Sequence, residues 1–334
     1  MDSQTLGWGI VGLGRIAGTE IAPAISASAN STLVSVVSRD QARAEAFARD
    51  HGAASALDDY AKMLADPAVG VVYIATPNAL HAEQVIAAAR AGKHVLCDKP
   101  LAVTVADAQH CVAECRSAGV RLGITFQTRN HDGMAEAAAL VRDGAIGKVV
   151  AAEAQMGTGG RLPQGWRTDP DLAGLGTLNN IGVHAFDILR YLVGSEVSEV
   201  VALVGSEPGY LVDTTALVLL RFRSGALAQV NANQAARSPR DDIALYGTEG
   251  RVLWRNLSRP GRDGTLSFVT RDGERETPAS SRGAYQRTIE AFADAVADGR
   301  DPNPSGEDGL RSVELTAAIA DSIRERRVVS LSAQ

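Results

Sequence analysis

Short apolar runs and segments of helical periodicity alternate through the first third of the chain. The apolar runs are rich in β-branched residues, which predicts buried strands. These runs are LGWGIVG, TLVSVVS, VGVVYIAT, KHVLCD and RLGITFQ. Because helix-length segments separate them, we predict a parallel, doubly wound sheet domain over residues 1–125.

The segments between these runs carry the end signals of helices. Asp40 is an N-cap candidate, and Gly92 and Gly119 stand where a left-handed residue ends a helix. The predicted helices cover residues 15–27, 40–50, 79–91 and 104–118.

Residues 126–334 have a different pattern, with longer apolar runs that follow one another directly. The runs VVAAEAQMG, EVSEVVALVG, TTALVLLRF, ALAQVNANQ and DIALYG predict a meandering antiparallel or mixed sheet. Helices are predicted over residues 131–143, 183–193, 285–298 and 308–326. The chain is therefore predicted to be an α/β protein of two domains, 1–125 and 126–334.

Composition narrows the classes of partner. The net charge of −6 excludes a broad basic field, so neither nucleic acid nor membrane is an expected partner. From the pattern we expect neither a signal peptide nor a membrane span. Its three cysteines, Cys97, Cys111 and Cys115, suit a reducing, cytoplasmic compartment and form no metal-binding pattern.

A glycine-rich turn follows the first predicted strand. Gly12, Gly14 and Ala17 have the spacing G-x-G-x-x-A at a strand-to-helix junction. Such a turn lets the backbone approach a pyrophosphate, and the helix start offers free amides to it. A structural turn is the alternative. We assign cofactor binding to Gly12, Leu13, Gly14, Arg15 and Ile16.

The end of the second strand bears on which dinucleotide binds. An NAD site usually has an acid here, whereas this strand ends at Ser38 and Arg39, with Arg43 one turn into the helix. A hydroxyl and guanidinium groups suit a ribose phosphate, so NADP(H) is favoured. NAD(H) is the alternative, because Asp40 can serve as the acid one or two residues later.

Further motifs give the chain a family resemblance. They are ATPN from Ala75 with His81, GKHVLCDKP from Gly92, TRN from Thr128, QGWR from Gln164, GVHAFD from Gly182 and YGTEG from Tyr246. With these motifs, nearly the whole chain resembles the Gfo/Idh/MocA family of oxidoreductases. The resemblance implies a Rossmann domain and a C-terminal α/β domain with an open-faced sheet, an active site at the seam between them, and a homo-oligomer, dimer or tetramer.

The resemblance also implies site residues. Lys99 matches the lysine that contacts substrate and nicotinamide, and His184 matches the general acid/base. Asp98 stands where the family usually has Glu. The further cofactor-binding residues implied are Thr76, Asn78, His81, Asp98 and Lys99. A surface lysine and a helix-start histidine bound to main chain are the structural alternatives.

One departure concerns the partner of His184. Asn180 stands where the family commonly has Asp, and an amide can orient an imidazole but cannot stabilise its charge. Asp187 lies one turn from His184 and is the alternative acid, or a solvated helix acid. Both are predicted substrate-binding residues.

Two aromatic and basic elements complete the prediction. Trp166 and Arg167 lie in a glycine-rich loop and are assigned to substrate and cofactor binding; packing of the loop is the alternative. Arg129, beside Asn130, is assigned to both ligands, with a linker role equally open. Five residues are predicted core without chemistry: Tyr73, Leu96, Phe126, Ile188 and Leu192.

Together these residues predict an NADP(H)-preferring oxidoreductase acting on a CH–OH or carbonyl group of a sugar, anhydrosugar or polyol. Reduction of an anhydro-ketosugar is the narrowest version. The alternatives are an inositol, polyol or dihydrodiol dehydrogenase, and a dinucleotide-sensing regulator without turnover.

Overall fold

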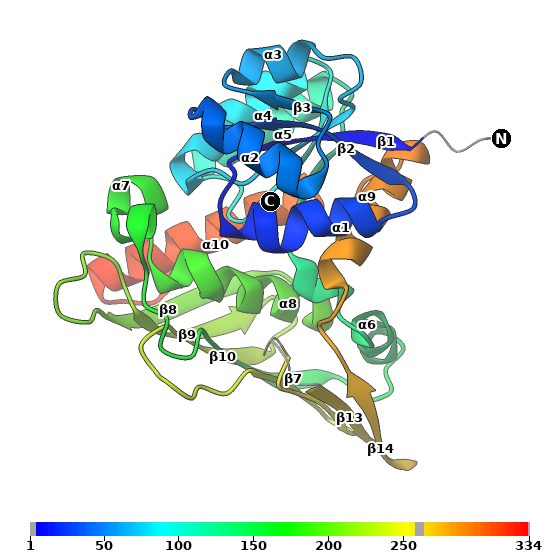
Figure 1. The fold of residues 1–334 in the computed structure, drawn as a ribbon. Coiled ribbons are helices and arrows are strands. Elements are labelled where there is room, and N and C mark those ends of the chain that lie inside the picture. Colours follow the sequence, from blue (N-terminus) through cyan, green and yellow to red (C-terminus); the bar gives the residue numbers. More distant parts are fainter. Residues whose placement is uncertain (1–4, 258–263, 333–334) are drawn as a thin grey trace. The chain divides into compact units, whose positions relative to one another are not determined.

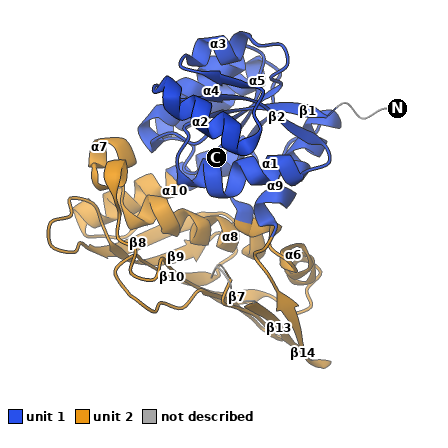
Figure 2. Ribbon diagram, viewed as in Figure 1, with its two compact units in different colours: residues 1–127, 283–313 blue, residues 128–282, 314–334 orange. Residues whose placement is uncertain are grey.

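The computed structural model describes residues 5–257 and 264–332 (Figure 1). They divide into two compact units, which Figure 2 distinguishes by colour. Unit 1 contains residues 1–127 and 283–313, and unit 2 contains residues 128–282 and 314–334. The sequence places a single boundary after residue 125; it does not predict that the chain returns to the first unit near its end.

Unit 1 is built on a parallel sheet of six strands in the order β3-β2-β1-β4-β5-β6. The strands are β1 (Leu6–Val11), β2 (Ser31–Val37), β3 (Ser55–Leu57), β4 (Val71–Ile74), β5 (His94–Cys97) and β6 (Leu122–Ile124). The direction of the strand order reverses between β1 and β4. In sheets of this kind, ligands bind outside the carboxyl ends of the strands at this reversal point.

Helices connect these strands with the predicted end signals. They are η1 (Ala17–Ile21), α1 (Ala22–Ala27), α2 (Gln41–His51), α3 (Tyr60–Ala65), η2 (Asn78–Leu80), α4 (His81–Arg90) and α5 (Val105–Ser117). Asp40 caps α2 by accepting the Arg43 N–H at 3.2 Å, and Thr104 caps α5 in the same way. Gly92 and Gly119 have φ values of 73° and 67°, which confirms their expected left-handed conformation.

Helix α9 (Ala284–Ala297) joins unit 1 although it lies far along the chain. Its Ile289 and Phe292 belong to the same buried cluster as Trp8 of β1, and the rings of Trp8 and Phe292 are 5.7 Å apart. A Cβ on Gly123 would lie 2.8 Å from the Phe292 ring, so the glycine makes room for this packing. The packing of its apolar side chains therefore makes α9 part of this core.

Unit 2 contains a mixed sheet of nine strands in the order β14-β13-β12-β11-β7-β10-β9-β8-β15. The strands are β7 (Val149–Gly157), β8 (Val197–Gly205), β9 (Thr215–Phe222), β10 (Leu227–Asn233), β11 (Asp242–Gly247), β12 (Arg251–Arg255), β13 (Gly264–Thr270), β14 (Gly273–Ala279) and β15 (Val329–Ser330). Among the described strands of this sheet, only β7 and β10 pair in parallel. The predicted α/β class and the mixed second sheet are confirmed.

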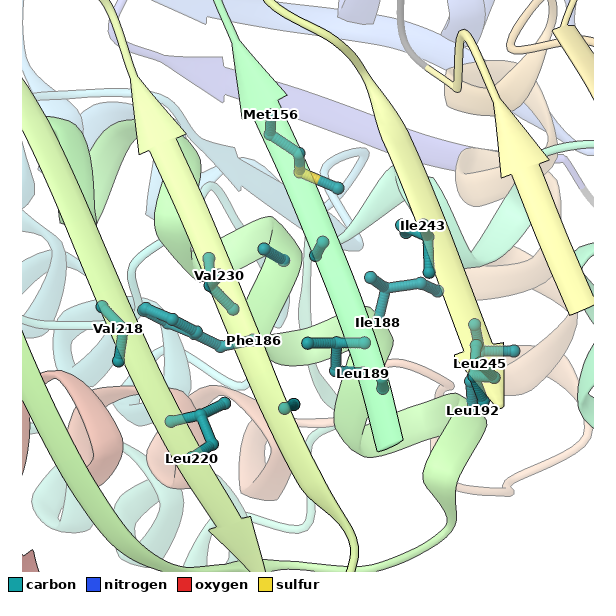
Figure 3. Packing of buried hydrophobic residues seen from close by; sticks show 14 of the residues in the cluster. Met156, Phe186, Ile188, Leu189, Leu192, Val218, Leu220, Val230, Ile243 and Leu245 are labelled. Carbon is teal, nitrogen blue, oxygen red and sulfur yellow. The ribbon is translucent and has the colours of Figure 1, made fainter. Parts of the chain in front are cut away.

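One face of this sheet is covered by α8 (Val183–Val193). Figure 3 shows Phe186, Ile188, Leu189 and Leu192 of α8 against the side chains of β7, β9, β10 and β11. The helix has the bounds that the sequence predicts, because its apolar residues recur at helical spacing almost throughout its length. The other helices of unit 2 are η3 (Gln127–Asn130), α6 (Met134–Arg142), η4 (Gly165–Thr168), α7 (Pro170–Ala173) and η5 (Leu178–Gly182).

The opposite face of the sheet exposes large apolar side chains on β8, β9 and β10. Leu203, Leu217, Leu219 and Leu227 are between 49% and 74% exposed. Leu203 pairs with Leu217 across β8 and β9, and the burial of β9 alternates strictly, so these side chains share a face. We call these four residues the leucine face.

The last helix, α10 (Gly306–Glu325), contributes residues to both units. The five predicted core residues are all buried. In the described part of the chain, no helix is both long enough and apolar enough to cross a bilayer.

Candidate functional site

The glycine turn after β1 lies at the reversal point of the unit 1 sheet. Gly12 has φ +91°, and a Cβ there would lie 2.6 Å from the main-chain carbon of Ala75 and the nitrogen of Thr76. Only glycine permits this close approach of the turns that follow β1 and β4. At Gly14, by contrast, no described atom beyond the adjoining chain lies within 4 Å of where a Cβ would stand. The backbone of Gly14 is therefore open to a ligand.

The turn itself, which leads into the following helix, is fixed by burial and by a hydrogen bond. Leu13 is buried in the core of unit 1 and its carbonyl oxygen accepts a hydrogen bond from Nη2 of Arg43 at 2.5 Å. Arg15 is exposed and Ile16 is half-buried. The helix begins at Arg15 and continues after Ile16 as the π-helical segment η1, a form that often occurs at functional sites. Amide groups at such a helix start carry the partial positive charge that attracts phosphate.

One serine, two arginines and one acid follow the end of β2. The acid, Asp40, is already engaged as a helix cap. The carboxylate of Asp40 caps α2, while Ser38 Oγ accepts the Asp40 N–H at 3.2 Å. Arg39 is exposed. Arg43, assigned to the ribose phosphate from the sequence, uses one guanidinium nitrogen to fix the glycine turn.

The segment after β4 is held by a buried histidine. His81 is 1% exposed; its Nδ1 lies 2.7 Å from the Pro100 carbonyl oxygen and its Nε2 lies 2.9 Å from that of Thr76. Both ring nitrogens are thus engaged with main chain. The sequence groups His81 with the cofactor-binding residues, whereas the structure gives it the role of joining the turns after β4 and β5. Thr76 Oγ1 donates to Gln84, and Asn78 is buried.

Lys99 follows β5 at the same edge of the sheet. It is half-buried, and its N–H donates to Oδ1 of Asp98 at 2.9 Å. Asp98 therefore shapes the backbone beside Lys99. Tyr285 of α9, which the sequence analysis did not single out, is another neighbour of this acid: burial, and then the Asp98 carboxylate, raise the pKa of Tyr285. Because Tyr285 lies far from Asp98 along the chain, the sequence pattern does not reveal this interaction.

In unit 2, the predicted acid/base lies at the start of α8. The π-helical segment η5 carries Asn180 and runs directly into α8, where His184 lies one turn later. Both side chains are half-buried. The Asn180 N–H donates to the Gly176 carbonyl oxygen at 3.0 Å, so the segment before η5 sets the position of Asn180.

Asp187 and Arg129 form a buried ion pair. Arg129 Nη2 lies 2.6 Å from Asp187 Oδ1, and Nε lies 2.9 Å from Oδ2. Asp187 is 0% exposed, and the guanidinium also lies 4.9 Å from the centre of the Tyr191 ring. The sequence assigns Asp187 and Arg129 to ligands. Their burial against each other attaches η3 to α8, and their predicted contacts with ligands stay predictions.

Trp166 and Arg167 lie on η4 and are half-buried. The Arg167 guanidinium stacks over the Trp166 ring, 4.3 Å from its centre. A stacked pair of this kind offers a flat surface and hydrogen-bond donors together. Its predicted contact with ligands stays a prediction.

Asp213 is a residue that sequence reasoning missed. It is buried before β9, and its carboxylate accepts main-chain N–H groups from Gly176 and Leu178. No motif in the sequence marks it, because its partners lie about 35 residues away.

In the described residues, no cluster of histidine, cysteine, aspartate and glutamate is placed to hold a metal ion. The three cysteines are free and buried, and burial raises the pKa of Cys111 to about 12.

Comparison with known proteins agrees with this arrangement. Residues 6–126 match the family model described as an oxidoreductase family with an NAD-binding Rossmann fold, and residues 134–253 match the GFO/IDH/MocA C-terminal domain.

Individual relatives cover nearly the whole chain. The chain is 34% identical to 1,5-anhydro-D-fructose reductase of Ensifer adhaerens, over 93% of this chain and 94% of that protein. It is 33% identical to D-xylose 1-dehydrogenase (NADP(+)) 2 of Haloferax volcanii, over 97% and 99%. Among solved structures, levoglucosan dehydrogenase in complex with NADH has a TM-score of 0.90 at 26% identity, covering 99% of this chain and 100% of that one. The chain therefore belongs to the GFO/IDH/MocA oxidoreductase family.

Proposed function

We propose that this protein is an NAD(P)-dependent oxidoreductase that interconverts a hydroxyl and a carbonyl group on a sugar, anhydrosugar or polyol. The observation that carries the proposal is the glycine turn, where Gly12 brings two loops together and Gly14 leaves the backbone open at the reversal point of the sheet. The relatives named above act, by their names, on sugars and anhydrosugars.

The turn fits a dinucleotide. The open side of Gly14 and the amides at the start of the helix, from Arg15, would receive the pyrophosphate. The bound cofactor supplies or accepts the hydride. Thr76 and Asn78, after β4, and Asp98, after β5, would line the nicotinamide end of the same sheet edge.

Two side chains would stabilise the developing charge and transfer the proton. The Lys99 ammonium would orient the substrate oxygen and stabilise negative charge that develops on it. The His184 imidazole would take the hydroxyl proton during oxidation and return it during reduction. Asn180 would orient the ring, while Trp166 and Arg167 would contact the sugar.

The preferred cofactor in this proposal is NADP(H). Asp40 is engaged as the cap of α2, which leaves Ser38, Arg39 and Arg43 as the polar groups at the end of β2. Parallel titrations with NADPH and NADH test this. We expect tighter binding of NADPH and a loss of that difference in Arg39→Ala; equal or tighter binding of NADH would refute the assignment.

The narrowest substrate proposal is reduction of an anhydro-ketosugar, by analogy with the Ensifer adhaerens relative. A panel of 1,5-anhydro-D-fructose, xylose, myo-inositol and levoglucosan, each with both cofactors, tests this ranking. The highest kcat/KM on 1,5-anhydro-D-fructose would support it.

The same panel, repeated with Lys99→Met and His184→Gln, tests the two chemical roles. We expect each variant to lose about a hundredfold or more in kcat, in line with the usual contribution of a positioned acid/base. Cofactor affinity should hold in His184→Gln. Unchanged turnover in both variants would remove the catalytic assignment.

A second candidate function is dinucleotide sensing without turnover, favoured by Asn180 in place of an acid beside His184. Tight cofactor binding without turnover on any substrate of the panel would support this candidate over the enzyme.

We further propose that the protein works as a homo-oligomer, dimer or tetramer, in the cytoplasm. The leucine face supports the first part, because monomers seldom expose so many large apolar side chains side by side. Three free thiols support the second.

A further inference from the structure

One residue binds the whole start of the helical segment that carries Asn180 and His184. Asp213 Oδ1 accepts the Gly176 N–H at 2.6 Å, and Oδ2 accepts the Leu178 N–H at 2.9 Å. The Asp213 carbonyl oxygen accepts the Thr177 N–H at 2.8 Å. Three consecutive amides, which an isolated helix start would leave without a protein partner, are thus satisfied by a single residue.

The fit at this point leaves no space for adjustment. A Cβ on Gly176 would overlap the main-chain oxygen of Asp213 and would lie 2.9 Å from its nitrogen. The glycine therefore allows the helix start to press directly against the Asp213 backbone. Neither chain segment can shift along the other without breaking these bonds.

Asp213 is itself attached to the sheet. The next residue, Thr214, donates its N–H to the Gly205 carbonyl oxygen at 2.9 Å, and its carbonyl oxygen accepts the Gln234 N–H at 2.8 Å. These bonds connect the start of β9 with the ends of β8 and β10. The position of Asp213 is therefore fixed by three strands.

The effect of this attachment reaches the candidate chemical groups through the backbone. The Gly176 carbonyl oxygen accepts the Asn180 N–H, and His184 follows one turn later. We propose that Asp213 is a positioning residue that fixes the start of η5 on the sheet and so sets the orientation of Asn180 and His184. The proposal rests on the proposed function for the meaning of that orientation.

A carboxylate suits this role better than an amide. It offers two acceptor oxygens to two N–H groups, and its charge complements the positive end of the helix. An asparagine would offer one oxygen and would place an NH2 group against the other N–H donor. Burial raises the pKa of Asp213, although the main-chain N–H groups act in the opposite direction. Enclosing the charged carboxylate here therefore costs free energy.

The test compares Asp213→Asn with Asp242→Asn. Asp242 lies in the same unit and also accepts a main-chain N–H, from Asn256 at 3.0 Å, but on β11. Hydrogen exchange of the 176–182 amides, the NMR signal of the His184 ring, and steady-state kinetics are measured on each protein. The ring signal is assigned with His184→Gln.

We expect Asp213→Asn to raise amide exchange at 176–180 by about tenfold or more, the equivalent of losing one such bond. The His184 ring signal should shift, and kcat should fall while the dissociation constant of the cofactor stays within about twofold. Asp242→Asn should leave all of these values near wild type. Asp213→Glu, which keeps both oxygens, should recover part of kcat.

Two results would overturn the proposal: an unchanged His184 signal with unchanged exchange in Asp213→Asn, or equal changes in Asp242→Asn. If the variant does not fold, the wild-type protein still decides, because rapid exchange of the 176–178 amides contradicts the role and protection supports it. If no sugar is turned over, the proposed function fails, while exchange and the ring signal still test the positioning role.

Discussion

At the residue scale, the buried pair of Arg129 and Asp187 shows how charge and burial decide a role. Both oxygens of Asp187 accept from the Arg129 guanidinium, and neither residue is more than 9% exposed. A carboxylate enclosed in this way costs free energy unless its partner remains. The pair therefore ties η3 to α8, and its removal should act on stability before it acts on chemistry.

The first prediction follows from this enclosure. Arg129→Met should lower the free energy of unfolding by about 3–5 kcal/mol, because it leaves the Asp187 carboxylate buried without its partner. The double variant Arg129→Met/Asp187→Leu should recover most of that loss. Chemical denaturation followed by tryptophan fluorescence measures both.

The exposed pair of Arg221 and Glu199 provides the control. Its side chains are 53% and 42% exposed, so Arg221→Met should cost less than about 1 kcal/mol. An equal loss in Arg221→Met and Arg129→Met would contradict the structural role of the buried pair.

A second residue-scale prediction concerns pH. The Arg121 N–H donates to Nδ1 of His94 at 2.9 Å, and burial, followed by the charge of Arg121, lowers the pKa of His94 below 6.5. As the pH falls through this range, the unfolded chain takes up a proton that the folded chain refuses, so stability decreases toward acid. The free energy of unfolding should fall less steeply below pH of about 6.5 in His94→Gln than in the wild type. Identical slopes would refute this contribution.

The sequence predicts the role of some residues and not of others, depending on where their partners lie along the chain. Gly12 and Gly14 are recognisable because their function depends on neighbours in sequence. Asp213 and Tyr285 are not, because their partners come from distant segments. The same holds for the ion pair of Asp187 with Arg129, which lies far away along the sequence.

At the element scale, periodicity predicts an element well when one face is buried and the other is not. Helix α8 and strand β9 have the expected pattern and lie where it places them. Strand β14 (GERETPA) is largely exposed and polar, so its position in the sheet depends on pairing with β13 and leaves no apolar pattern to read. Helix α9 was predicted as a helix, but its membership of unit 1 depends on tertiary packing.

The third prediction tests that membership. Phe292→Ala should cost about 3–5 kcal/mol, because the ring fills the space between Trp8 and Gly123 in the core of unit 1. Hydrogen exchange should increase in the strands of unit 1. Leu211→Ala, at a leucine that is 83% exposed, should change stability by no more than about 0.5 kcal/mol. A loss confined to unit 2 would contradict the assignment of α9.

At the scale of the whole molecule, the two faces of the unit 2 sheet differ. One face is covered by α8, and the other bears the leucine face. A second copy of the chain packed against this face would remove these leucines from water, at about 25 cal/mol for each Å² of apolar surface.

The fourth prediction is that Leu217→Lys/Leu219→Lys yields a smaller assembly than the wild type. Two lysines would place charge in the centre of the leucine face, where burial is costly. Light scattering coupled to size-exclusion chromatography measures the mass. Val328→Lys, at an exposed residue outside the leucine face, is the control. A wild-type monomer would refute the oligomer itself.

The central claim is that the turn at Gly12 to Gly14 binds a pyridine dinucleotide, and Gly14→Val tests it most directly. A Cβ at Gly14 meets no described atom beyond the adjoining chain within 4 Å, so the substitution should change the melting temperature little while filling the space for the pyrophosphate. Gly205→Val, at a glycine with equally open surroundings, is the matched control.

In calorimetric titrations with NADPH and NADH, we expect binding to the wild type and to Gly205→Val, and affinity weaker by at least about tenfold in Gly14→Val. No binding of either dinucleotide to the wild type, or equal affinity in Gly14→Val, would contradict the claim.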